Sequence, residues 1–200
     1  MEMAENGIIE EFEFFWQKES PFSQWHDSPF WKDGWNFVTA EQYMMLSKAV
    51  LFRDYEIAEQ ILRVEDPQQQ KKLGRQVKHF NEERWNLHCI HVVKAANREK
   101  FSQNDHLRNL LFSTYPRTLV EASPYDTVWG IGWRIENFEA WNKYTWRGLN
   151  LLGFALTDVR NEMMIKEGII SDSAPTRQAE EAIQPAINDM FCHTPHETEV

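Results

Sequence analysis

Two acidic residues flank a break in an extended stretch near residue 120. Glu121 follows the apolar pair Leu119-Val120, which is typical of a strand, and the pattern stops at Ser123-Pro124 because proline lacks the N–H that a strand ladder requires. After the break come, in order, Asp126, Trp129, Gly130 and Gly132. Glycines at this spacing let the backbone approach a ligand or another chain segment. This stretch can form the wall of a cleft, or a solvated turn with a core tryptophan, and its spacing fits both.

A second acid and an amine lie on one predicted helix. Thr39 and Gln42 form a capping-box pair, so the helix begins at Thr39 and continues through Phe52. Glu41 falls in the first turn, where the helix dipole stabilises negative charge. Lys48 lies two turns later on the same face, about 10 Å away. The alternative interpretation is a surface acid that complements the dipole and a solvated lysine.

The composition is that of a globular protein rich in aromatic rings. The chain has 200 residues, of which 42% are hydrophobic and 14% aromatic, with nine Trp and thirteen Phe. A chain of this length can bury roughly 70% of its unfolded surface in one domain. It contains no run of apolar residues long enough for a membrane span, and its acidic start is unlike a secretory signal. A net charge of −10 argues against broad binding to duplex nucleic acid, although Arg75, Lys78 and Arg84 can form a local basic rim.

The cysteines and histidines indicate neither disulfides nor a metal site. Cys89 and Cys192 lie far apart, so we expect a reducing compartment, the cytoplasm. His88 and His91 can share a helix face, but no further Cys/His pair completes a four-ligand set. The cluster Cys192, His193 and His196 lies in a predicted tail, which is a poor support for a rigid site. We therefore predict no metal and no cofactor.

Periodicity and capping residues predict a mainly helical domain. We expect a mobile leader at residues 1–11, a core at 12–168 and a tail at 169–200 that is partly helical at most. Strands are expected at 12–16, 36–38 and 118–121. Helices are expected at 39–52, 55–64, 82–101, 105–113 and 149–166. A further helix is expected to start at Asp66-Pro67 and to carry Leu73, Val77 and Phe80 on its buried face. The stripe Trp85, Cys89, Val92, Val93 and Ala96 should face the core.

An ordered set of short motifs then resembles a known family. The set is Phe22-Ser23-Gln24-Trp25, Thr39 to Met45, Lys48-Ala49, Leu73-Gly74-Arg75, Leu119 to Ser123, Asp126 with Trp129 to Gly132, and Gly148 to Gly153. Each motif alone is weak, but the ordered set resembles the YbiA-like, or NADAR, proteins over residues 14–164. The chain has Gln24-Trp25 where many of these proteins have Asn-Phe.

The resemblance implies a fold, an activity and a set of site residues. It implies a compact single domain of the α+β class, mainly α with a few short strands. It also implies an N-glycosidase that cleaves the bond between a ribose carbon and a base-like nitrogen. Its members act on phosphorylated pyrimidine intermediates of riboflavin synthesis or remove ADP-ribose from guanine. Carried over position by position, the implied catalytic residues are Glu41, Lys48, Glu121 and Asp126, and the implied substrate-binding residues are Trp129, Ser23, Asn150 and Gly130.

These residue types suit the implied chemistry. Hydrolysis at a ribosyl carbon passes through an oxocarbenium-like state, which a nearby carboxylate stabilises. We expect Glu41, at a helix N-terminus, to stay ionised at neutral pH. Asp126 or Glu121 would hold the ribose hydroxyls or activate water, Lys48 would bind a phosphate or polarise the leaving group, and Trp129 would stack on the base. The residues leave the assignment of roles among the three acids open.

The leading hypothesis is an N-glycoside hydrolase for small phosphorylated ribosylated heterocycles. The alternatives are a glycohydrolase for ADP-ribosylated guanine in nucleic acid, and a non-catalytic module that binds ADP-ribose or a nucleotide. Because the chain has a net negative charge, we rank a nucleic-acid substrate below a small-molecule substrate. We expect no membrane partner, and the sequence leaves the oligomeric state open.

Overall fold

The computed structural model describes residues 10–172, and these form a mainly helical α+β domain. In chain order the elements are β1 (Phe12–Phe15), β2 (Phe30–Lys32), β3 (Trp35–Phe37), α1 (Ala40–Leu51), α2 (Tyr55–Leu62), α3 (Pro67–Gly74), α4 (Glu82–Ser102), α5 (Asp105–Ser113), β4 (Thr118–Glu121), the short 3-10 helices η1 (Phe138–Trp141) and η2 (Lys143–Thr145), and α6 (Leu151–Lys166). The predicted fold class is confirmed. Most of the predicted leader and tail, residues 1–9 and 173–200, lies outside the described residues.

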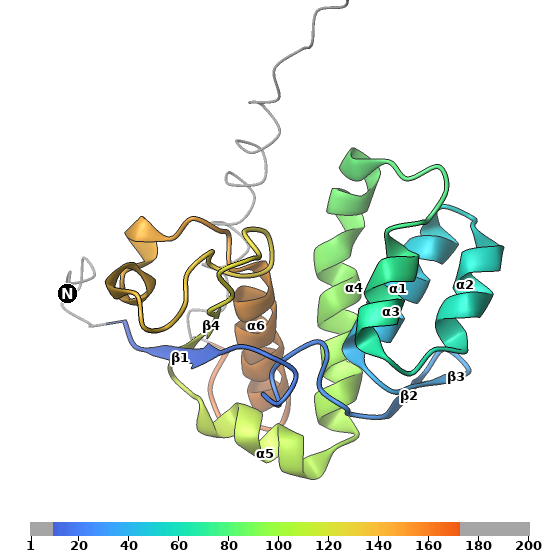
Figure 1. Ribbon diagram of the computed structural model, residues 1–200. Coiled ribbons are helices and arrows are strands. Elements are labelled where there is room, and N and C mark those ends of the chain that lie inside the picture. The colour runs from blue at the N-terminus through green and yellow to red at the C-terminus, as the bar shows by residue number, and fades with distance from the viewer. Residues whose placement is uncertain (1–9, 173–200) are drawn as a thin grey trace, which may run out of the picture.

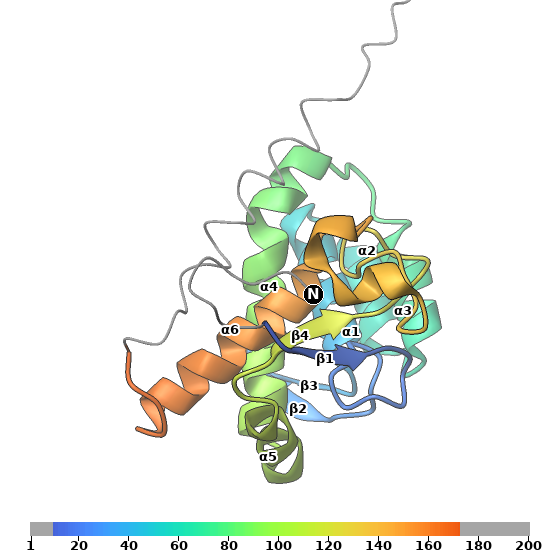
Figure 2. The same ribbon diagram turned by 90° about the vertical axis from the view of Figure 1, so that its left-hand side faces the viewer.

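The long helix α4 runs through the middle of the molecule (Figures 1 and 2). On one side it contacts α1, which packs with α2 and α3, and on the other side it contacts α6. The strands β1 and β4 form a parallel pair beside α6, and the antiparallel pair β2–β3 lies beside α4 and α1. In the parallel pair Glu121 lies opposite Phe15, so the end of β4 is next to the start of the loop that leads toward α1.

Apolar stripes on α4 and α6 build the core. Of the predicted α4 stripe, Trp85, Cys89, Val93 and Ala96 are buried and Val92 is half-buried. The predicted α6 stripe is buried throughout: Leu152, Ala155, Leu156, Val159 and Met163. Between the two helices Lys94 Nζ lies 2.9 Å from Asp158 Oδ2, and both side chains are buried. This ion pair and the apolar stripes hold α4 against α6.

The predicted starts of the first four helices are confirmed by their capping bonds. The Thr39 hydroxyl accepts from the Gln42 backbone N–H at 3.1 Å, although the Gln42 side chain accepts from Val38 N–H rather than from Thr39. Asp54, Asp66 and Asn81 each accept backbone N–H groups at the starts of α2, α3 and α4.

Three local predictions are corrected by the structure. The third helix ends at Gly74, so Val77 is buried in the following loop and Phe80 is 43% exposed instead of lying on a helix face. Gly74 packs so closely on Met45 that a Cβ there would lie 1.9 Å from the Met45 sulfur. The last helix begins at Leu151, because Asn150 adopts a left-handed conformation with φ of 53°. Strand β2 was not predicted.

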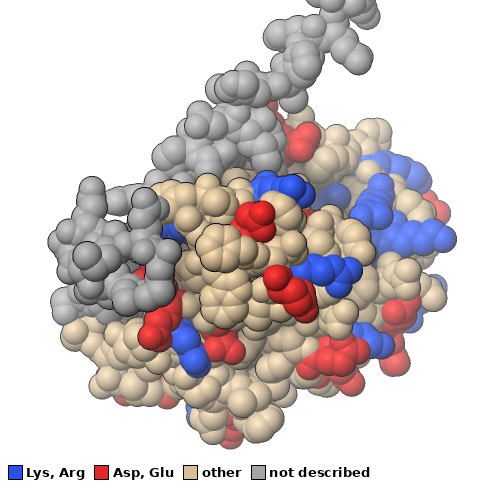
Figure 3. All heavy atoms as spheres, turned by 60° about the vertical axis from the view of Figure 1, so that its left-hand side comes forward, with Lys and Arg blue, Asp and Glu red and all other residues tan. Residues whose placement is uncertain are grey.

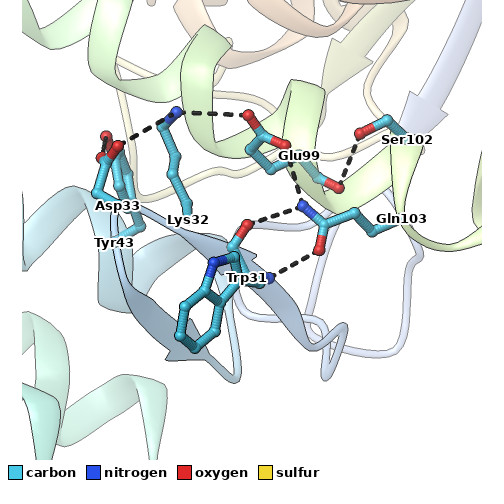
Figure 4. A network of polar contacts seen from close by, with 7 residues as sticks. All are labelled: Trp31, Lys32, Asp33, Tyr43, Glu99, Ser102 and Gln103. Atoms are coloured by element: carbon cyan, nitrogen blue, oxygen red, sulfur yellow. Dashed lines mark hydrogen bonds and ion pairs between the residues drawn. The ribbon is translucent and has the colours of Figure 1, made fainter.

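Strand β2 is fixed by polar contacts with the end of α4 (Figure 4). The Gln103 side chain accepts from the Trp31 N–H and donates to the Trp31 carbonyl, both at 2.8 Å. Lys32 Nζ donates to Glu99 at 3.4 Å. β2 pairs with β3 along one edge, and these contacts satisfy its other edge with residues more than sixty positions away in the sequence.

Candidate active site

The turn after β4 holds Asp126 in a defined orientation. Asp126 Oδ1 accepts the backbone N–H groups of Val128 at 2.9 Å and Trp129 at 2.7 Å. Gly130 brings this turn back against the end of the strand, since a Cβ there would lie 2.9 Å from the Glu121 carbonyl oxygen and 3.1 Å from that of Asp126. Gly130 therefore makes its close approach to the protein backbone at Glu121 and Asp126, and this contact keeps the turn that carries Asp126 against the end of the strand that carries Glu121.

Glu41 is buried at the start of α1. Only 6% of it is exposed, and burial raises the pKa of its carboxyl from 4.5 to about 7. Asp126 adds to this rise, while Lys71, Arg75 and a hydrogen bond from the Trp25 side chain oppose it. The expectation that Glu41 stays ionised at neutral pH therefore holds only in part, because desolvation outweighs the stabilisation at the helix N-terminus.

Glu121 lies in the same electrostatic environment. Burial raises the pKa of its carboxyl to about 8, with further increases from Asp126 and Glu41 and a decrease from Lys71. Its Oε2 atom is buried without a hydrogen-bond partner among the described residues. A buried carboxyl oxygen without a partner is costly unless the group is protonated or a ligand supplies a donor. Both observations favour the protonated form of Glu121 at neutral pH.

The structure brings the three acids together from distant parts of the chain. Glu41 comes from α1, Glu121 from the end of β4 and Asp126 from the following turn. The charge of Asp126 acts on both glutamates, and the charge of Glu41 acts on Glu121. Within residues 10–172, no group of three or more His, Cys, Asp and Glu is arranged to hold a metal ion. The predicted tail cluster Cys192, His193 and His196 lies outside this range.

Cations surround the acids. Lys48 is half-buried, its ammonium lies 4.1 Å from the Phe80 ring centre, and burial lowers its pKa while Glu41 raises it. Lys71 and Arg75, one turn apart on α3 and at its C-cap, also act on Glu41. Neither residue was predicted as part of the site: Arg75 was named in a family motif and in the basic rim, and Lys71 was not named. Their i, i+4 spacing on one helix face was the available signal.

The remaining candidates support the site through the backbone. Asn150 is fully buried, and both ends of its amide bond β4: Oδ1 accepts from Glu121 N–H at 2.9 Å and Nδ2 donates to the Leu119 carbonyl at 3.0 Å. The Ser23 hydroxyl accepts from the Trp25 N–H at 3.2 Å. Trp129 is half-buried and packs against the main hydrophobic core. The observed contacts of these residues are with the protein, and their predicted contacts with substrate stay predictions.

An open hollow of about 510 Å³ has Trp25 in its lining. It is lined by Lys18, Glu19, Trp25, His26, Asp27, Val38, Thr39, Glu65 and Pro67. Trp25 belongs both to this hollow and to the surroundings of Glu41. The three candidate acids are not part of its lining.

Charge is unevenly distributed over the surface despite the net charge of −10. On the face drawn in Figure 3, Lys and Arg side chains gather toward the right-hand side, and uncharged side chains cover much of the centre. In the predicted basic rim, Lys78 Nζ forms an ion pair with Glu56 at 3.0 Å, so the carboxylate partly offsets the positive charge of Lys78. None of the helices in the described part of the chain is long and apolar enough to cross a membrane.

A mainly helical α+β domain with one buried and two half-buried acids, flanked by cations, fits a protein that acts on a glycosidic bond. The family model described as the NADAR domain matches residues 14–164. The chain belongs to the NADAR family, as the ordered motifs predicted.

Named relatives agree with this membership. Protein irg-1 of Caenorhabditis elegans is 40% identical over 150 residues, which is 70% of this chain and 71% of that protein. N-glycosidase R617 of Acanthamoeba polyphaga mimivirus is 41% identical over 146 residues, covering 70% of this chain and 86% of that protein. The NMR structure of Escherichia coli YbiA matches with a TM-score of 0.66 and 27% identity, covering 84% of this chain and 94% of that one. The family and these relatives support an N-glycosidase, a hydrolase that acts on N-glycosyl bonds.

Proposed function

We propose that this chain hydrolyses the bond between ribose and a base-like nitrogen in small phosphorylated ribosylated heterocycles. The observation that carries the proposal is the convergence of Glu41, Glu121 and Asp126 beside the cations Lys71 and Arg75. The acids supply groups for bond cleavage, and the cations supply a place for a phosphate. Neither set is needed for packing, because both contain buried or half-buried charged groups that cost stability.

The two glutamates suit opposite halves of an acid–base pair. Glu121 is protonated at neutral pH and can donate its proton to the leaving nitrogen as the C–N bond breaks. Glu41, with a pKa of about 7, is partly ionised at neutral pH. Its carboxylate stabilises the positive charge on the ribosyl carbon and takes a proton from the attacking water. The products are the free base and ribose phosphate.

Asp126 holds the two glutamates in these states. Its charge raises the pKa of both, and the two backbone N–H groups that bond its Oδ1 keep it in place. We propose that its second oxygen, Oδ2, contacts a ribose hydroxyl. Lys71, Arg75 and Lys48 then bind the phosphate, an interaction that is strong where charges are partly desolvated.

Intermediates of riboflavin synthesis are one fitting substrate group. A relative named riboflavin biosynthesis protein PYRR, from Zea mays, is 32% identical over 155 residues, which is 23% of that protein. The likeness is to a part of PYRR, so the substrate is proposed from the chemistry of the site and supported by this name. Because Lys78 of the basic rim is paired with Glu56, we continue to rank nucleic acid below a small molecule as the substrate.

The test is release of base by the purified chain. We expect a panel of ribosylated heterocycles, each with and without its phosphate, to yield free base by chromatography, with the phosphorylated members cleaved faster. Glu41→Gln and Asp126→Asn should stay folded and lose about 100-fold or more in turnover. Glu56→Gln, an exposed acid on α2, is the matched control. Tight ligand binding without any product would instead show a binding module, and release from ADP-ribosylated guanine alone would show the nucleic-acid alternative.

A further inference from the structure

The ammonium of Lys48 lies against two aromatic rings. It is 4.1 Å from the centre of the Phe80 ring and 5.9 Å from the centre of the Trp85 ring, distances at which a cation is attracted to the face of a ring. Lys48 is half-buried and, within residues 10–172, forms no ion pair with a carboxylate. The rings therefore stabilise the ammonium without neutralising it, and its charge stays available to an anionic group of a ligand.

Phe80 lies in a loop that is fixed on both sides of it. We call residues 75–81 the α3–α4 loop. Two residues before Phe80, the backbone N–H of Lys78 donates to Asp54 Oδ2 at 2.9 Å, and the residue directly after Phe80 caps the start of α4. The Phe80 ring itself packs edge to face with the buried ring of Phe52, with 5.3 Å between their centres. Phe80 thus has a defined position, although 43% of it is exposed.

Lys48 lies on the face of α1 that carries Glu41. The two residues are seven positions apart in one helix, which places them about 10 Å from each other along the same side. The start of the α3–α4 loop reaches this part of α1 as well, because Gly74 packs directly on the side chain of Met45. Arg75 follows Gly74 in the chain. The ammonium that the rings hold is therefore on the side of α1 where the candidate acid and a second cation lie.

We propose that Phe80, together with the buried Trp85 of α4, is a positioning residue for Lys48 and holds its ammonium where the phosphate of the ribosyl substrate binds. The inference rests on the proposed function and adds to it the way in which one of the phosphate-binding cations is held. Lysine carries its charge on a flexible four-carbon stem, so an unheld ammonium loses conformational entropy when it binds a phosphate. Rings that hold the ammonium before the substrate arrives reduce this cost and strengthen the binding.

The alternative role of the contact is packing, with the lysine stem covering a partly exposed ring. The two roles differ in what they change. A packing contact affects the free energy of unfolding, whereas a positioning contact affects the binding of phosphorylated ligands and does so only through Lys48. Phe80→Leu removes the ring and keeps an apolar side chain, and Phe80→Tyr keeps the ring.

The experiment compares variants of the full chain by steady-state kinetics on a ribosylated heterocycle with and without its phosphate. We expect Phe80→Leu to raise KM for the phosphorylated substrate about threefold to tenfold, with kcat and the KM for the unphosphorylated analogue nearly unchanged. Phe80→Tyr should keep both KM values within about twofold of the wild type, because the face of its ring remains. In a Lys48→Met background Phe80→Leu should change KM no further, since the cation that the ring holds is absent.

Phe138→Leu is the matched control, since Phe138 is an exposed phenylalanine of η1 and should change none of these values. Three results would overturn the inference. They are an unchanged KM for the phosphorylated substrate in Phe80→Leu, an equal rise in KM for both substrates, and an effect of Phe80→Leu that persists in the Lys48→Met background.

Two NMR readouts are independent of base release. In the wild type the two rings should shift the ε-methylene protons of Lys48 upfield, with the signal assigned by Lys48→Met, and Phe80→Leu should remove much of this shift. Inorganic phosphate should perturb the same signal, and at higher concentrations in Phe80→Leu than in the wild type. If the wild-type chain releases no base, the proposed function fails and the phosphate titration decides the inference. Equal affinity for phosphate in the two proteins, or no binding in either, would overturn it.

Discussion

Asn150 holds the backbone of Glu121 from the left-handed position that precedes α6. Its Oδ1 accepts from the Glu121 N–H at 2.9 Å, and its Nδ2 donates to the carbonyl of Leu119 at 3.0 Å. The side chain thus takes the place that another strand would have on this edge of β4. It links the start of α6 to the strand that ends in a candidate acid.

Replacement of Asn150 should therefore cost both stability and activity. Asn150→Ala leaves a buried N–H and a buried carbonyl without partners, and alanine strains the left-handed backbone. We expect the free energy of unfolding to fall by about 2–4 kcal/mol in urea denaturation. Asn142→Ala is the matched control, since its single bond to the Tyr144 N–H is exposed. Equal losses in the two variants would contradict this role of Asn150.

The stability of the protein should fall as pH rises through the range in which the two glutamates ionise. Burial raises the pKa of Glu41 to about 7 and that of Glu121 to about 8, so the folded state binds more protons than the unfolded state above pH 4.5. The stability contributed by each protonated carboxyl is present below pH 4.5 and is lost through its folded pKa.

Substitution by glutamine should reveal this penalty. Glu41→Gln and Glu121→Gln are expected to be more stable than the wild type at pH 9, each by up to about 3 kcal/mol, and to lose this advantage in acid. Thermal unfolding over a series of pH values measures it. A stability difference that is independent of pH would contradict the raised pKa values.

Removal of the α3 cation should shift the pH dependence and weaken phosphate binding. The Lys71 ammonium lowers the pKa of Glu41 and of Glu121, so Lys71→Gln should move the acidic limb of the pH–rate profile upward. It should also raise KM for a phosphorylated substrate about tenfold and leave KM for the unphosphorylated analogue nearly unchanged. Lys72→Gln, its exposed neighbour on α3, is the control. A similar rise in KM for both substrates would exclude a contact with the phosphate.

The buried ion pair between α4 and α6 should be sensitive to loss of one partner. Asp158→Asn leaves the Lys94 ammonium, which is 7% exposed, with Glu162 as its remaining carboxylate at 3.3 Å. We expect a loss of about 2–4 kcal/mol in the free energy of unfolding. The double variant Lys94→Met, Asp158→Leu should recover much of it, because no buried charge is left unpaired. Glu56→Gln, which breaks the exposed pair with Lys78, should cost less than about 1 kcal/mol.

Local signals in the sequence were enough for most of the secondary structure. Asp54, Asp66 and Asn81 cap the helices that they predict, and α5 has its expected bounds of Asp105–Ser113. These signals work because a cap or a stripe of apolar residues involves neighbours within one or two turns. Strand β2 pairs with the nearby β3, but it was not predicted, because it has only three residues and its other edge is held by Gln103 and Glu99, which are distant in the sequence.

The sequence by itself also determined the family and predicted the candidate acids, through the ordered motifs around Glu41, Glu121 and Asp126. Only the tertiary structure decided their ionisation. Burial depends on every element packed around a carboxyl, so the helix start that favours an ionised Glu41 locally is overruled by desolvation. The same holds for Lys71, whose effect on Glu41 arises because α3 packs against α1.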